Sequence, residues 1–233
     1  MLPAGADESP DVQELRHTVL TDLGTWGEPD VFVEARRRFE AFLQDRRALA
    51  PDEQETVLPI VMRQADAATF EQVHALARAA DNPSDLDRYY AALAAVRDPE
   101  LARQVVQIAL APSELPPQAV RLPIRMVLAL AREHPQLAWS AFSDHVDVLT
   151  APFPTFAPLI ISQYAPEAFW DAVPPDQLEA WVRAHVPAEM ADNVARGMES
   201  ARFQLSEKQA LIPAADAYVR SRAAASRGPP DGR

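Results

Sequence analysis

The stretch DLDRYYAALAAVRDPELARQVVQIAL, residues 85–110, decides the fold class of this chain. Its apolar side chains recur at the spacing of a helix turn, which gathers them on one face of a helix. They form two successive stripes: Leu86, Tyr89, Tyr90, Leu93 and Val96, then Leu101, Val105 and Ile108. Between the stripes, Asp98 followed by Pro99 is typical of a residue that caps a helix and a proline in its first turn. The stretch therefore predicts two short consecutive helices, each with an apolar face to bury.

The same helical spacing recurs from residue 11 to about residue 222. Proline is frequent (22 residues), glycine is rare (6 residues), and strong helix formers fill the stretches between the prolines. Short helices with apolar faces must stack on one another to be stable. We therefore predict an all-α fold of about eleven to thirteen short antiparallel helices, arranged as an α-solenoid or HEAT-like superhelical array. The last apolar stripe of this array is Leu211, Ala215, Tyr218 and Val219.

The periodicity also predicts how the chain is organised. Residues 11–222 are expected to form one helical-repeat domain, preceded by a flexible N-terminus at residues 1–10. The tail AAASRGPPDGR, residues 223–233, carries no apolar stripe and is expected to be disordered. The proline- and aromatic-rich stretch at residues 152–175 is a candidate for a change of direction within the array.

The charge balance argues against nucleic acid as a partner. The net charge is −12, and an acidic surface repels the phosphate backbone. The basic run at residues 36–38 is flanked by Glu34 and Glu40, so it reads as a solvated helix face and not as a binding patch. The absence of cysteine excludes disulfides and thiolate metal sites.

No part of the sequence is expected to cross a membrane. No run reaches the roughly 18 uninterrupted apolar residues that a membrane-spanning helix needs. The first residues, MLPAGADESPD, are acidic and lack the apolar core of a secretory signal. We therefore expect a cytoplasmic protein, while export of a longer parent protein stays open.

The residues of this chain do not predict a catalytic centre. A zinc site on one helix needs two histidines four positions apart, and no two of the five histidines have this spacing. The nearest cluster, Asp144, His145 and Asp147, reads as a solvated helix surface. A nucleophile elbow and a glycine-rich phosphate loop are also absent from the sequence. We predict no catalytic residue, no metal ligand and no cofactor in this chain.

Several segments, taken in order, resemble the C-terminal helical domain of M1-family zinc aminopeptidases, the aminopeptidase N family. The segments are LRHTVLTDLGTWGEPD (15–30), VFVEARRRFEAFL (31–43), LAPDEQETVLPIVMRQ (49–64), residues 85–110 and HPQLAWSAFSDHVDVL (134–149). This sequence differs from the family's pattern at two places. His134 and Pro135 replace the glycine that usually precedes this helix, and the loop LPPQAV (115–120) lacks the acidic residue found in the family's loop. No function of that loop is therefore assigned to Gln118.

This resemblance implies a noncatalytic domain, or a fragment of one, that caps the active-site chamber of an aminopeptidase and limits peptide access. The zinc would lie in the catalytic domain of the parent enzyme, and the partners would be that domain and the peptide substrate. Arg121 and Arg125 follow the 115–120 loop and are candidate peptide contacts, although an ordinary surface role is favoured for both. Gly197–Ser200 superficially echoes the family's peptide-binding loop but falls within a predicted helix, so we treat the echo as coincidence.

An alternative function remains open from the sequence. A helical array of this kind also serves as a free-standing scaffold that binds a protein or a peptide on its concave face. In that reading the chain would act without an aminopeptidase.

Overall fold

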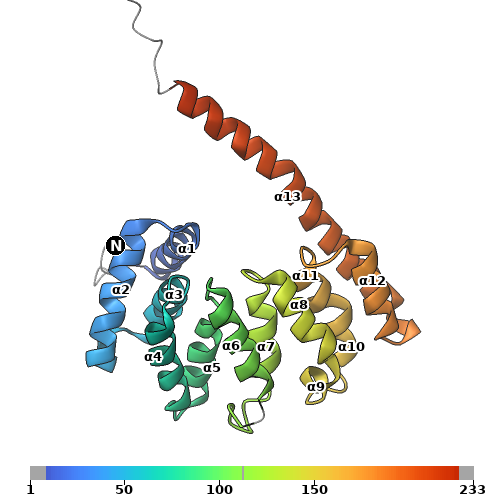
Figure 1. Cartoon of the computed structure of the whole chain (residues 1–233), viewed down its shortest axis with the longest axis horizontal. Coiled ribbons are helices and arrows are strands. Elements are labelled where there is room, and N and C mark those ends of the chain that lie inside the picture. The colour runs from blue at the N-terminus through green and yellow to red at the C-terminus, as the bar shows by residue number, and fades with distance from the viewer. Residues whose placement is uncertain (1–8, 112, 226–233) are drawn as a thin grey trace, which may run out of the picture. The chain divides into compact units, whose positions relative to one another are not determined.

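The structure, a computed structural model, describes residues 9–111 and 113–225. Every regular element in these ranges is a helix, and no described residue lies in a strand (Figure 1). The prediction of an all-α fold is therefore confirmed. The chain forms two compact units, Met1–Pro152 and Phe153–Arg233, which are described separately below. The boundary falls at the start of the proline-rich stretch that the sequence singled out.

The first unit contains most of the helices. In chain order they are α1 (Pro10–Trp26), α2 (Pro29–Gln44), η1 (Arg46–Ala48), α3 (Pro51–Met62), α4 (Ala67–Arg78), α5 (Pro83–Leu93), α6 (Pro99–Leu110), α7 (Leu122–Leu130), α8 (Pro135–Asp144) and α9 (Val146–Thr150). Proline stands in the first turn of α1, α2, α3 and α5 to α8. It fits there because its missing N–H group would have no partner within the helix and its φ angle is already helical.

Side-chain caps reinforce several of these starts. Asp98 accepts hydrogen bonds from the backbone N–H groups of Glu100 at 2.8 Å and Leu101 at 3.0 Å. Asp66 and Asn82 cap α4 and α5 in the same way. Each cap satisfies backbone donors that the first turn of a helix leaves free. The start of a helix at Pro99, predicted from the sequence, is thus confirmed.

The helices of the first unit pack in two layers. In one layer, α1 contacts α3, α3 contacts α5, and α5 contacts α7. The intervening helices pack against this layer, with α2 on α3, α4 on α5 and α6 on α7 (Figure 1). The core between the layers includes Phe39, Phe42, Tyr90 and Phe142, all fully buried. This alternation agrees with stacked helix pairs, while the superhelical, HEAT-like character of the stack stays a prediction.

The second unit is built around one long helix. Its elements are α10 (Ala157–Leu159), the π-helical turn η2 (Ile160–Tyr164), α11 (Ala165–Phe169), α12 (Pro175–Ala184), η3 (Ala188–Met190) and α13 (Ala191–Ala225). The first part of α13 packs against α11, η2 and α12. Gly197 lies at the closest approach, since a Cβ atom there would stand 2.2 Å from the backbone carbonyl oxygen of Ser162. The Gly197–Ser200 segment is thus part of a helix, as predicted.

The second part of α13 corrects one expectation from the sequence. Leu211, Tyr218 and Val219 belong to the last predicted apolar stripe, yet they are 59%, 62% and 63% exposed. The helix itself was predicted correctly, but no described residue covers this face. The helix also continues through Ala225, three residues into the predicted tail. The rest of that tail and residues 1–8 lie outside the described residues, so the predictions made for them stay predictions.

Among the described residues, none of the helices is both long enough and apolar enough to cross a bilayer.

Candidate functional site

The two arginines predicted as peptide contacts lie close together on the first unit. Arg121 directly precedes α7, Arg125 lies in its first turn, and both are exposed. The Arg125 guanidinium pairs with the carboxylate of Asp87 on α5. Arg121 makes no ion pair with any described residue. Contact of either side chain with a peptide stays a prediction.

The histidines are scattered through the first and second units. Within the described ranges, no group of three or more His, Cys, Asp or Glu side chains is gathered closely enough to hold a metal ion. His134 bonds through Nε2 to the carbonyl oxygen of Val96 at 2.9 Å, and the His185 ring stacks on Trp181. These histidines therefore have structural contacts.

His74 is the most buried of the described histidines and sits between Phe70 and Tyr90. Its Nδ1 accepts a hydrogen bond from the Arg78 guanidinium at 3.2 Å, so the proton of the neutral ring lies on Nε2. Nε2 is 3.4 Å from a carboxylate oxygen of Glu114. Burial, helped by the charge of Arg78, lowers the pKa of His74 and favours the neutral form.

A cluster of charged side chains joins the ends of several helices. Arg63 Nη1 lies 2.6 Å from Glu133 Oε1, and Arg97 Nε lies 3.3 Å from Glu133 Oε2. Both arginines also donate to the carbonyl oxygen of Thr25 near the end of α1, at 3.1 Å and 2.8 Å. The Arg63 side chain is 13% exposed, and its burial lowers its pKa.

Sequence reasoning missed this cluster. A usable signal existed for Arg63, because it directly follows Met62, the last residue of α3. A cation is stabilised there by the exposed carbonyl groups and the negative end of the helix dipole. The shared carboxylate of Glu133 was not predictable, since it is distant in sequence from Arg63.

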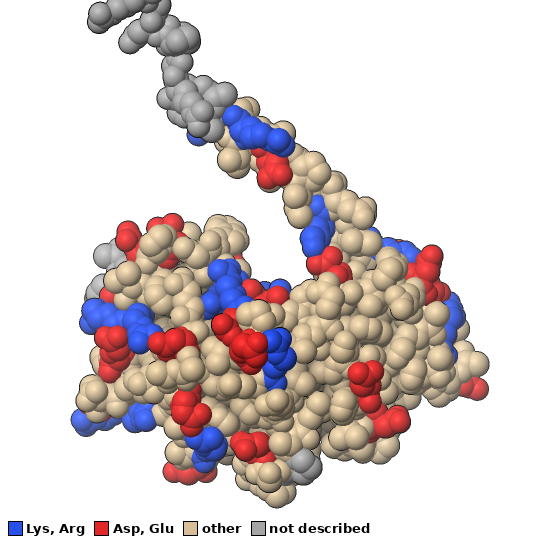
Figure 2. Space-filling model, in the orientation of Figure 1, with Lys and Arg blue, Asp and Glu red and all other residues tan. Residues whose placement is uncertain are grey.

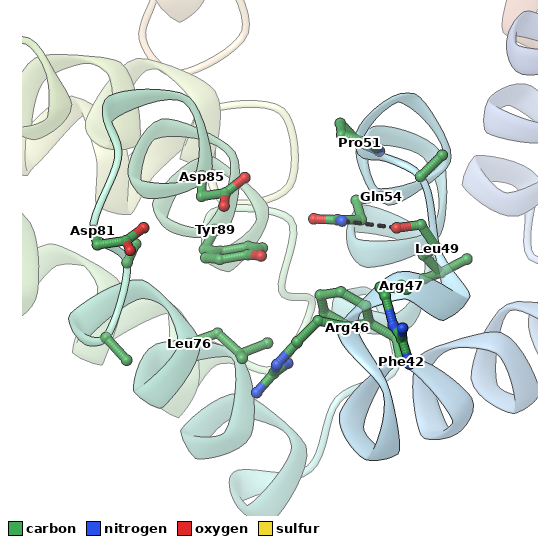
Figure 3. A pocket seen from close by; sticks show the side chains of 13 residues that line it. Phe42, Arg46, Arg47, Leu49, Pro51, Gln54, Leu76, Asp81, Asp85 and Tyr89 are labelled. Atoms are coloured by element: carbon green, nitrogen blue, oxygen red, sulfur yellow. Dashed lines mark hydrogen bonds between the residues drawn. The ribbon is translucent and has the colours of Figure 1, made fainter.

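The first unit also contains a pocket, which we call the bipolar pocket. It is an open hollow of about 560 Å³ between α2, η1, α3, α4 and α5. Buried side chains of Phe42, Leu76 and Tyr89 form its apolar part. Asp81 and Asp85 lie on one side of Tyr89, and Arg46 and Arg47 lie on the other (Figure 3). Nothing in the sequence pattern indicated this pocket, because its lining comes from five separate elements.

The rest of the visible surface carries mixed charge. Figure 2 shows acidic and basic side chains interspersed over the first unit and not gathered by sign. In the basic run at residues 36–38, Arg37 and Arg38 pair with Glu34 at 2.8 Å and 2.9 Å, and Arg36 pairs with Glu40 at 3.1 Å. The two hydrogen-bonded guanidinium groups lower the pKa of Glu34 to about 2. Arg38 also pairs with Glu53 of α3 at 2.9 Å, so each arginine of the run has a carboxylate partner.

Together these features define an all-α chain of stacked helices whose visible surface carries mixed charge and which offers a small pocket. The chain belongs to the family of ERAP1-like C-terminal domains, whose model matches residues 2–203. This match confirms the resemblance that the ordered segments indicated.

A curated relative supports the same family. The chain is 34% identical over 101 residues to aminopeptidase M1 of Arabidopsis thaliana, a stretch that covers 41% of this chain. That stretch spans only 12% of the length of the relative. The match thus spans only a small part of this aminopeptidase, and the activity of the whole enzyme is not carried over to this chain.

Proposed function

We propose that this chain is the noncatalytic C-terminal domain, or a fragment of that domain, of an M1-type zinc aminopeptidase. In this role it caps the active-site chamber and limits which peptides reach it. The observation that carries the proposal is the family match over residues 2–203, together with the named relative. The zinc and the residues that cleave the peptide would belong to the catalytic domain of the parent enzyme.

An exposed apolar stripe supports association with another domain. Four side chains of α1 lie at helical spacing and face solvent: Val12 (45% exposed), Leu15 (63%), Val19 (45%) and Trp26 (77%). An apolar face of this kind favours a packing partner, because covering it removes apolar surface from water. In the proposed function that partner is the catalytic domain.

Arg121 and Arg125 are the candidates for peptide contact in this arrangement. Arg121 is exposed and makes no ion pair with a described residue, so its guanidinium is available to a carboxylate of a peptide. The partner of Arg125, Asp87, is itself 43% exposed, and an exposed pair of this kind exchanges partners at little cost.

The experiment has two parts. The purified chain is first assayed with amino-acid arylamides, with and without zinc, and we expect no hydrolysis. The chain then replaces the C-terminal domain of the Arabidopsis aminopeptidase, and turnover is compared for an arylamide and for peptides of increasing length. We expect Arg121→Gln to change the rates for long peptides several-fold and to leave the arylamide rate unchanged.

A matched control is Arg103→Gln, which changes an exposed arginine on α6. Zinc-dependent hydrolysis by the purified chain would refute the noncatalytic role. A length profile that is identical with and without the chain would refute the role in peptide access.

The alternative function is a free-standing helical scaffold that binds a protein or a peptide. The exposed stripe of α13, with Leu211, Tyr218 and Val219, favours it because no described residue covers that face. A stable complex with a protein other than an aminopeptidase, together with a failure to complement the truncated enzyme, would favour this alternative.

A further inference from the structure

We propose that the bipolar pocket binds a small zwitterionic ligand that carries an apolar side chain. The ammonium group of the ligand lies on the side of Asp81 and Asp85, and its carboxylate lies on the side of Arg46. The apolar side chain packs on Phe42 and Leu76. This binding is a property of the chain itself and does not depend on the proposed role in an aminopeptidase.

The size and lining of the pocket suit a ligand of this class. A volume of about 560 Å³ lies within the range of small-molecule sites, roughly 300–1,000 Å³. Phe42 is fully buried, and Leu76 and Tyr89 are each 7% exposed, so they offer a fixed apolar surface. Such sites combine an apolar lining with a few polar groups that orient the ligand.

Tyr89 supplies a polar group without a partner. Its side chain is more than nine-tenths buried, yet its hydroxyl makes no hydrogen bond with any described residue. The neighbouring Tyr90, by contrast, donates to the carbonyl oxygen of Glu114 at 3.0 Å. Figure 3 shows Tyr89 between the acidic and the basic side of the lining. This hydroxyl can therefore donate a hydrogen bond to, or accept one from, a ligand in the pocket.

Each side of the pocket carries one uncompensated charge. Arg46 makes no ion pair with a described residue and lies over the Phe42 ring at 4.9 Å. The adjacent Arg47 is already held by both carboxylate oxygens of Asp45. Arg46 is therefore the guanidinium that remains available to a ligand.

On the acidic side, too, one of the two charged side chains has a charged partner and the other has none. The Asp85 carboxylate accepts hydrogen bonds from Arg88 and from the Asn82 amide. Asp81 contacts only the Asn82 amide at 3.3 Å and pairs with no cation among the described residues. A zwitterion compensates both free charges at once, whereas a ligand with one charge leaves the other uncompensated.

The charged groups on both sides of the pocket affect the pKa of the Tyr89 hydroxyl. Burial raises its pKa most, Asp85 raises it further, and Arg46 and Arg88 lower it. The phenol thus remains protonated and can donate to the carboxylate of a ligand. Two kinds of ligand share the required chemistry: a free amino acid with an apolar side chain, and a short peptide with both termini free.

The test is a titration of the whole, isotopically labelled chain followed by ¹H–¹⁵N NMR. The probes are L-leucine, leucyl-leucine, N-acetyl-L-leucine, which lacks the ammonium, and L-leucinamide, which lacks the carboxylate. We expect saturable shifts at the pocket residues with leucine or leucyl-leucine, and binding weaker by about tenfold or more with each blocked probe. The tighter of the two zwitterions identifies the source of the ligand.

Variants make the assignment specific. Arg46→Gln and Asp81→Asn should each weaken binding of the zwitterion about tenfold, and Tyr89→Phe should weaken it several-fold. Both charged side chains are exposed, so these two variants should keep the circular dichroism spectrum of the parent chain. Arg103→Gln, outside the pocket, should leave binding unchanged. Equal affinities for all four probes, or no saturable shift with either zwitterion, would overturn the proposal.

Discussion

Removal of the Glu133 carboxylate should destabilise the first unit strongly, because it leaves a buried guanidinium without its counter-charge. In the native state Arg63 Nη1 lies 2.6 Å from Glu133 Oε1, and the side chains of Arg63 and Glu133 are only 13% and 18% exposed. After Glu133→Ala, Arg63 keeps only the carbonyl oxygen of Thr25 at 3.1 Å, and its Nε has no partner even in the parent chain.

The expected magnitude follows from the burial of the pair. Loss of one partner from a fully buried ion pair costs about 3–5 kcal/mol. Arg63 retains one hydrogen bond and some contact with water, so we expect about 2–4 kcal/mol for Glu133→Ala. By contrast, Glu100→Ala removes an exposed pair with Arg103 and should cost less than about 1 kcal/mol.

The assay is urea unfolding of both variants and of the parent chain, followed by far-ultraviolet circular dichroism. The double variant Arg63→Met, Glu133→Ala removes the buried charge as well as its partner. It should therefore be more stable than Glu133→Ala alone. The reasoning is refuted if Glu133→Ala costs no more than Glu100→Ala, or if the effects of the two substitutions simply add.

Three further outcomes are expected. Gly197→Ala should destabilise the second unit by more than about 2 kcal/mol in thermal melts, because the new Cβ meets the Ser162 carbonyl oxygen and backbone cannot move aside; a melting temperature equal to that of the parent would contradict this contact. His74 has an ordinary pKa of 6.5 that is lowered in the folded state, so the unfolded chain binds its proton first. Its neutral form stabilises the fold fully above pH 6.5, and this contribution is lost as the pH falls from 6.5 through the lowered pKa. The urea midpoint of the parent chain should therefore fall with pH over this range, and His74→Phe should make that fall smaller. An unchanged dependence of the midpoint on pH in His74→Phe would exclude His74 as its source. Asp98→Ala should lower the free energy of unfolding by about 1 kcal/mol in the same assay, because the backbone N–H groups of Glu100 and Leu101 lose their acceptor at the start of α6. A cost below about 0.3 kcal/mol would show that Pro99 alone starts the helix.

The sequence by itself determined where helices form and where several of them begin. A helix is held by hydrogen bonds between residues that are close in the chain, so its signals are local. Asp98 with Pro99 indicated the start of α6, and the apolar spacing of residues 85–110 indicated the faces of α5 and α6 that are now buried. The order of such segments also carried the family resemblance that the match to residues 2–203 confirmed.

Only the tertiary structure decided what covers each apolar face and which distant side chains meet. The stripe of α13 that includes Leu211 and Tyr218 has the same periodicity as the buried stripes, yet both side chains lie exposed. Periodicity shows which face of a helix is apolar, but it contains no information on whether another element packs there. Likewise, Glu133 joins Arg63, and Arg46 lies across a pocket from Asp81, because separate helices bring their ends together. These contacts depend on the packing of the helices and not on the order of residues within any one of them.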